Sequence, residues 1–136
     1  MIERKNPDTH SITEEVYKAY SFSQTVRVGD LYFFAGLAPV AGDLQTFHLV
    51  GEGDMKVQLE MCLRILDELL AHEDLDRSNV VSWTMYTTDM PALCAVMGPI
   101  IADWVGDHAP ANTMVTVSGF VTPGQLIEIT PIAVRN

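Results

Sequence analysis

Basic residues are scarce in this chain of 136 amino acids, since 8 Lys and Arg stand against 18 Asp and Glu for a formal net charge of -10. The basic residues are spread along the sequence and form no cluster. A surface of this charge repels phosphate groups, so nucleic acids and anionic membranes are disfavoured as partners. Even the long apolar run from Leu31 to Val40 is far too short to cross a membrane.

Cysteine is equally rare. Cys62 and Cys94 both lie inside apolar runs, where a small buried side chain is the ordinary role, and two cysteines are too few for a disulfide framework. The 4 histidines are isolated from one another, so none has the spacing of a metal site. No glycine-rich phosphate loop, repeat or signal-peptide core is present. We therefore expect a cytoplasmic protein without metal or cofactor.

The apolar residues are numerous enough for one core. They make up 48% of the chain, which at 15.0 kDa has the size of a single domain. Residues 1–18 are polar and contain Pro7, which predicts a loosely held N-terminal arm. The folded domain is then expected over residues 19–136.

The domain opens with two predicted strands. Apolar and polar residues alternate over 21–28, and residues 31–35 are apolar on both faces, which predicts a central strand. Gly29 and Asp30 between them indicate a hairpin turn. The following segment, 37–53, is rich in glycine and has the length of loops that often frame binding sites.

Two helices are predicted farther along the chain. From Asp54 to about His72, apolar residues recur at alternating spacings of four and three, which places them on one face of a helix. A second helix is expected around residues 93–104. Pro99 lies inside it and should kink it or restart it, because proline lacks the backbone donor.

Three more strands, over 80–86, 113–118 and 125–134, complete the order ββαβαββ. This order predicts an α+β domain in which a mixed sheet carries two helices on one face. Because several strands are apolar on both sides, the other face of the sheet needs cover, and an oligomer would supply it.

One residue breaks the local pattern. Glu128 lies within an apolar strand, and the period of two places it on the same face as Leu126, Thr130 and Ile132. A carboxylate there is either at the rim of the sheet, open to water, or a desolvated acid suited to proton transfer. The sequence alone leaves both readings open.

Several short motifs carry a resemblance when they are taken together and in order: Phe22-Ser23-Gln24-Thr25-Val26, Phe34-Ala35-Gly36, Val80-Val81 through Thr88-Asp89, Ala109-Pro110-Ala111, and Ile127-Glu128-Ile129 with Ile132-Ala133-Val134. Over residues 20–134 the chain resembles the Rid family (YjgF/YER057c/UK114), whose members are also called endoribonuclease L-PSP proteins. The resemblance implies a chorismate-mutase-like fold. It also implies a homotrimer that binds small molecules in clefts between subunits.

The resemblance further implies a chemistry. The best-understood members hydrolyse reactive enamines and imines to keto acids and ammonia. Glu128 matches the family acid, which orients water or supplies a proton, and Gly36 matches the glycine that ends a strand. Pro123 roughly matches a proline of the cleft. Backbone groups at Gly36 and just after position 112, where Met114 lies, are implied to bind substrate.

Four positions depart from the family pattern, and one of them is Pro91, which stands where the family often has an asparagine. Phe22 stands where the family has a tyrosine, Ala35 where it has a serine, and Asn112 where it has the arginine that grips the substrate carboxylate. Arg–carboxylate pairs are charge-assisted and bidentate, and a neutral amide cannot replace that interaction in kind. We therefore expect a larger, more apolar cleft with Asn112 and Glu128 as its polar ends, unless Arg27 or Arg64 replaces the lost cation.

Three functional hypotheses follow. The first is a hydrolase or deaminase of an enamine or imine other than the standard small imino acids, with Glu128 activating water and Asn112 positioning the substrate. The second is a trimer that binds a small metabolite without turnover. The third, endoribonuclease activity, is disfavoured because the chain is acidic and has no basic groove.

Overall fold

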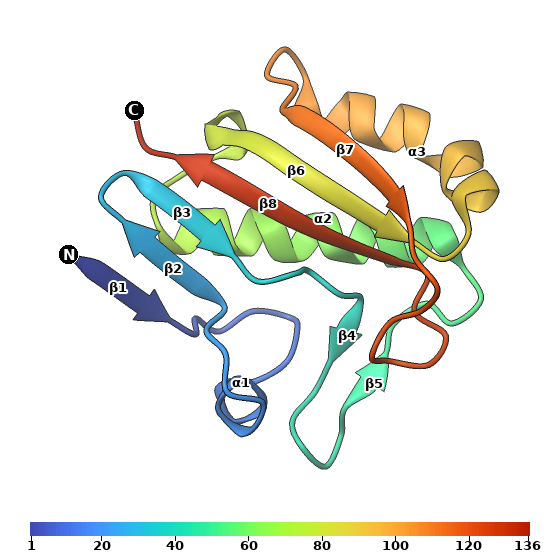
Figure 1. Ribbon diagram of the computed structural model, residues 1–136, viewed down its shortest axis with the longest axis horizontal. Helices are drawn as coiled ribbons and strands as arrows, with labels where there is room; N and C mark the ends of the chain where they lie inside the picture. The colour runs from blue at the N-terminus through green and yellow to red at the C-terminus, as the bar shows by residue number, and fades with distance from the viewer.

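The computed structural model describes all residues, 1–136, as one main sheet with two long helices on one face (Figure 1). The main sheet has the order β1-β2-β3-β8-β6-β7, and β4 and β5 form a separate small sheet. The strands are β1 (Ile2–Lys5), β2 (Thr25–Val28), β3 (Leu31–Phe34), β4 (Val40–Ala41), β5 (His48–Leu49), β6 (Val80–Thr87), β7 (Ala111–Thr116) and β8 (Ile127–Val134). The helices are α1 (Glu14–Ala19), α2 (Met55–His72), the 3-10 turn η1 (Arg77–Asn79) and α3 (Met90–Val105). None of them combines the length and hydropathy needed to cross a bilayer.

The strand pairings confirm the α+β fold with a mixed sheet. β2 and β3 form the predicted hairpin, in which Val28 pairs with Leu31 and Gly29 adopts a positive φ of 60° at the turn. β3 is an interior strand between β2 and β8, as its two apolar faces predict. β6 and β7 are parallel because α3 crosses between them, whereas the other neighbours in the sheet are antiparallel.

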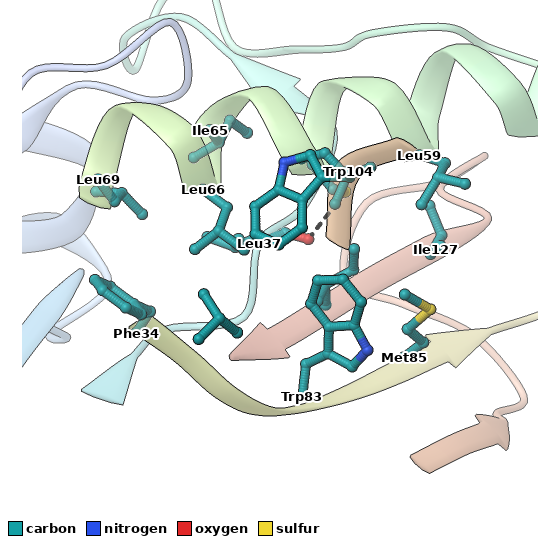
Figure 2. Close-up of a cluster of buried hydrophobic side chains, with 14 of the residues drawn as sticks. Phe34, Leu37, Leu59, Ile65, Leu66, Leu69, Trp83, Met85, Trp104 and Ile127 are labelled. Carbon is teal, nitrogen blue, oxygen red and sulfur yellow. Dashed lines mark hydrogen bonds between the residues drawn. The ribbon is translucent and has the colours of Figure 1, made fainter. Parts of the chain in front are cut away.

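Helix α2 supplies most of the core. Asp54 caps its N-terminus, where the carboxylate accepts a hydrogen bond from Val57 N at 3.1 Å. Figure 2 shows Leu59, Leu66 and Leu69 projecting from α2 toward the sheet, where Trp83 and Met85 lie. The predicted stripe of apolar residues is therefore the face by which α2 packs on the sheet.

Helix α3 continues through Pro99 as one element from Met90 to Val105, so of the two outcomes predicted for this proline, a kink or a restart, the restart does not occur. Leu93 and Trp104 are both buried in the core, one on each side of Pro99. Packing at both ends therefore holds the two halves in one helix even though proline removes a backbone donor.

The N-terminal segment is not the loosely held arm that its polarity predicts. β1 pairs antiparallel with β2, so it extends the sheet by one strand. Lys5 forms an ion pair with Glu73 at 3.1 Å, and the His10 backbone N donates to Glu68 at 2.7 Å. Pairing with β2 stabilises a four-residue strand whose own sequence carries no strand pattern.

The sheet face opposite α2 and α3 is apolar and open. Phe33 pairs with Val26 and Ile132 on its two neighbours, which places all three side chains on this face. Phe33 is 42% exposed, and Val28 and Leu31 beside it are each 41% exposed. These five residues and Val134, which pairs with Leu31, are called the outer apolar face below.

Candidate functional site

A pocket of about 390 Å³ lies at the end of the sheet where β3 leaves and β8 begins. Its walls come from α1 and the loop after it, from the segment between β3 and β5, and from the loop before β8. In Figure 1, α1 and the β4–β5 hairpin lie at this same side of the sheet. The loop over 37–53, expected to frame a site, contributes Leu37, Ala38, Val40 and Phe47.

Glu128 is the charged residue of this pocket. It is the second residue of β8, whose side chains alternate strictly between buried and half-buried, and Glu128 belongs to the half-buried set with Thr130 and Ile132. The Gln125 side-chain amide donates to Glu128 Oε1 at 3.3 Å and to the Ile127 carbonyl oxygen at 3.0 Å. Glu128 is thus a partly desolvated carboxylate that points into the pocket and has one neutral donor.

Gly36 makes room for this carboxylate. Leu37 and Ile129 exchange two backbone hydrogen bonds, of 2.7 and 3.1 Å, which brings the chain at Gly36 against β8. A Cβ atom at Gly36 would lie 2.5 Å from Glu128 Oε2, well inside contact distance. The glycine is therefore required by the close approach of the Glu128 side chain.

An aromatic wall lines the same pocket as the carboxylate. Tyr17 of α1 and Phe22 meet edge to face, with ring centroids 5.0 Å apart. Tyr17 is buried, and burial raises its pKa to about 12, against an opposing interaction with the Gln24 side chain. The Tyr17 hydroxyl therefore stays protonated at neutral pH and can serve as a hydrogen-bond donor.

The pocket brings together four of the residues predicted from the sequence. Phe22, Gly36, Pro123 and Glu128 all line it. They come from three separate segments of the chain. The bridge between Leu37 and Ile129 brings the segment that follows β3 against β8.

Three predicted residues lie outside this pocket. Asn112 and Met114 are in β7, an edge strand separated from β8 by β6, with Asn112 opposite Trp83 and Met114 packed on the core. Ala35 immediately precedes Gly36, and it is not among the lining residues. A cleft with Asn112 and Glu128 as its two polar ends therefore cannot form within one chain, and it stays a prediction about neighbouring copies.

Sequence reasoning missed part of the pocket wall. Tyr17, Tyr20, Phe47 and Gln125 line it, but none was selected as a site residue. Tyr17 lies in a segment that composition assigned to the arm. The one signal in the sequence is that Tyr17 directly follows the apolar Val16, and both side chains are buried in the short helix α1. Gln125 stands three residues before Glu128, which is the one signal that could have associated the two.

No cation replaces the expected arginine within the chain. Arg27 donates to the Gly29 carbonyl oxygen at 2.8 Å and lies over the Tyr32 ring, and Arg64 pairs with Glu68 at 3.5 Å. Neither lines the pocket. No group of three or more His, Cys, Asp or Glu side chains is arranged to hold a metal ion.

Comparisons with known proteins identify the fold and the family. Residues 12–135 match the model of the family described as Endoribonuclease L-PSP. Protein DfrA of Myxococcus xanthus is 33% identical, with 83% of this chain and 84% of that protein covered. A RutC family protein of Synechocystis is 31% identical, with 83% and 85% covered.

Solved structures agree. A Mycobacterium tuberculosis member of the YjgF/YER057c/UK114 family is 27% identical over 93% of this chain and 98% of that one, with a TM-score of 0.75. A Yersinia pestis protein of the Rid family, 23% identical over 98% of this chain and 100% of that one, has the same fold with a TM-score of 0.80. The match over almost the whole sequence and the shared fold together show that the chain belongs to the endoribonuclease L-PSP family, the YjgF/Rid group.

Proposed function

We propose that this protein hydrolyses or deaminates an enamine- or imine-type small molecule other than the standard small imino acids. The observation that carries the proposal is one half-buried carboxylate, Glu128, at the edge of a pocket of about 390 Å³ whose lining is mainly apolar. Apolar pockets with a few convergent polar groups are the usual form of small-molecule sites.

The arrangement around Glu128 suits addition of water to a carbon–nitrogen double bond. Gln125 holds Oε1 of the Glu128 carboxylate, and Oε2 lies against Gly36, so the side chain is restricted at the wall of the pocket that these three residues line. On this proposal the carboxylate accepts a proton from water as the water oxygen bonds to the imine carbon. That proton then goes to the nitrogen, which gives a carbinolamine. As the carbon–nitrogen bond breaks, the hydroxyl proton of the carbinolamine also passes to the nitrogen by way of the carboxylate, so a carbonyl compound and ammonia leave.

The residues that differ from the family pattern argue against small imino acids as substrates. Such substrates carry a carboxylate, and no Lys, Arg or His lines the pocket to bind it. Phe22 and Ala35 lack the hydroxyl groups of the family residues, and Asn112 lacks the charge. These replacements do not weaken the binding of an apolar substrate, because an apolar group needs no charged partner when it is buried.

We also propose that copies of the chain associate as a trimer through the outer apolar face. Support comes from the three exposed side chains Val28, Leu31 and Phe33, whose burial removes contiguous apolar surface from water. β7 is an edge strand that pairs with β6 on one side only, so its other side is open to a neighbouring copy near Asn112. In such a trimer Asn112 of one subunit would complete the Glu128 pocket of the next.

Binding without turnover is the second candidate. It is favoured by the apolar wall of Tyr17 and Phe22, which offers contact area but only one hydroxyl group for proton chemistry. Ribonuclease activity is disfavoured, because a chain of net charge -10 with no basic residue in its pocket has little to hold an RNA backbone.

Ammonia release from freshly generated imines tests the proposal. The panel contains 2-aminoacrylate and bulkier imines, with Asn112→Arg assayed beside the native protein. We expect little turnover of 2-aminoacrylate by the native protein, a gain with Asn112→Arg, and loss of all turnover with Glu128→Gln. Native activity on 2-aminoacrylate equal to that of the variant would contradict the proposed change of substrate. Ligand binding without any ammonia release would favour the binding protein.

A further inference from the structure

The pocket has a one-sided charge balance. Glu128 is its one ionisable carboxylate, and none of the residues around it is basic. Six of the chain's 8 basic residues are held elsewhere by ion pairs, hydrogen bonds or an aromatic ring, namely Lys5, Lys18, Arg27, Arg64, Arg77 and Arg135. Neither of the remaining two, Arg4 and Lys56, lines the pocket. The charge of Glu128 is therefore not neutralised from within the chain.

The neutral groups around Glu128 do not offset its negative charge either. The hydrogen bond to Glu128 comes from the neutral Gln125 amide, whose nitrogen also serves the Ile127 carbonyl. The negative charge reaches the interior, where burial and Glu128 together raise the pKa of the Cys62 thiol. A partly desolvated carboxylate with so little compensation gains most from a cation, since attraction between opposite charges strengthens as water is excluded.

The walls favour the same kind of ligand. Tyr17, Tyr20, Phe22 and Phe47 place four aromatic rings around the pocket. Ring faces attract organic cations, and their area also accommodates an apolar body. Aliphatic side chains such as Val16 and Leu37 extend the apolar wall. The polar side chains beside them are all neutral, so they offer an anionic ligand no charged partner, namely Ser11, Gln24, Thr122 and Gln125.

We propose that this pocket selects an organic monocation, a protonated imine or amine on an apolar or aromatic body that bears no carboxylate. The inference deepens the proposed function, on which its chemical part rests. A protonated imine, R₂C=NH₂⁺, would place its nitrogen at Glu128 and its body against the aromatic wall. Water adds to the carbon, and Glu128 transfers one water proton to the nitrogen, which gives R₂C(OH)NH₃⁺. The carbon–nitrogen bond then breaks as the hydroxyl proton passes to the departing ammonia, so the products are R₂C=O and NH₄⁺ with no change in oxidation state.

Equilibrium binding tests the charge preference without requiring turnover. Isothermal titration calorimetry with 2-phenylethylammonium, 2-phenylethanol and 3-phenylpropanoate compares a cation, a neutral molecule and an anion on similar bodies. We expect the cation to bind about tenfold more tightly than the alcohol, the ratio expected of one charge-assisted contact, and the anion to bind most weakly. Equal affinities, or tightest binding of the anion, would overturn the inference.

Two variants locate the effect. Glu128→Gln preserves size and should reduce the preference for the cation to about twofold or less, because the local charge is gone. Glu60→Gln removes the same charge from an exposed position of α2 outside the pocket. It should leave the preference unchanged. An equal loss in both variants would attribute the preference to the net charge of -10 and overturn the assignment to the pocket.

Ammonia release separates the two proposals. The substrates are an apolar ketimine, protonated in part at neutral pH, and 2-iminopropanoate. Turnover of the ketimine in preference to the imino acid supports both proposals. Preferred binding of the cation without turnover of either compound supports the cation site and contradicts the hydrolase. Turnover of 2-iminopropanoate alone supports hydrolysis as the reaction, but it contradicts both the cation site and the proposed change of substrate.

Discussion

Single atoms determine where the Glu128 carboxylate can point. Gly36 contributes no side chain, and the space that a Cβ would occupy is filled by Glu128 Oε2. The backbone at Gly36 has no positive φ, so the glycine is needed for space and not for its conformational freedom. The position of the acid therefore depends on a residue that has no functional group of its own.

Gly36→Ala should displace Glu128 while leaving the fold intact. Because the new methyl group would start 2.5 Å from Oε2, the carboxylate must rotate away, and we expect turnover to fall by about 10²-fold. Ammonia release and thermal unfolding are the measurements. Gly98→Ala in α3, where nothing lies within 4 Å of the added atom, is the matched control and should keep full activity. Unchanged activity in Gly36→Ala would show that the position of Glu128 is unimportant.

Tyr17 gives the protein a specific alkaline weakness. Burial raises its pKa from 10.0 to about 12. Between these values the unfolded chain releases the proton and the folded chain retains it, so the free energy of unfolding should decrease as the pH rises from 10 toward 12. In Tyr17→Phe this part of the decrease should be absent. Urea unfolding at pH 8, 10 and 11 measures it, and parallel curves for the two proteins would contradict the assignment.

At the scale of elements, the first residues of α2 and α3 determine where each helix begins, and the side chains that each helix buries stabilise it. Asp54 and Asp89 each accept a backbone hydrogen bond three residues on, from Val57 N and Ala92 N, both at 3.1 Å. Both helices then run from a polar cap into residues that the sheet buries. The cap sets the start of each helix, and tertiary packing supplies most of the stability.

Asp54→Ala should lower the free energy of unfolding by about 1 kcal/mol, since it leaves the first turn of α2 without its side-chain acceptor. Chemical denaturation measures the change. Glu60→Ala, at an exposed position inside the same helix, is the control and should stay within about 0.5 kcal/mol of the native protein. A cost at position 60 as large as that at 54 would assign the effect to charge and not to capping.

Elements with a pattern of their own were predictable from the sequence, and elements that depend on a partner were not. The stripe of α2 and the period of β8 located the main helix and the face of Glu128. β1 and α1 were missed, because four and six residues carry too little pattern and are held by β2 and the core. The pocket shows the same division: Glu128 stood out in its strand, whereas Tyr17 came from the segment assigned to the arm.

At the scale of the whole molecule, the sheet has one packed face and one open one. α2 and α3 cover the inner face, while Phe33 and its neighbours on the outer apolar face remain open in the single chain. The proposed trimer would give this face a role in stability, and it would place β7 of each copy near another copy.

Phe33→Glu should therefore yield single chains of 15.0 kDa, where the proposed assembly predicts a trimer for the native protein. A charge introduced into a buried apolar contact costs more than the contact contributes, so association is lost. Light scattering after size exclusion gives the mass. Leu44→Glu, at a residue 48% exposed in the β4–β5 loop and away from that face, should leave the mass unchanged. A native protein that is already a single chain would refute the proposed assembly.

The two ends of the chain lie together at the side of the sheet remote from the pocket. Ile2 pairs with Val28 next to the β2–β3 turn, and Arg135 N donates to the Asp30 carbonyl oxygen at 2.9 Å in that same turn. The pocket begins at the other end of β3, at Gly36. A tether, affinity tag or fused protein joined to either terminus would leave the pocket mouth unobstructed, so immobilised protein can be used to screen for the ligand.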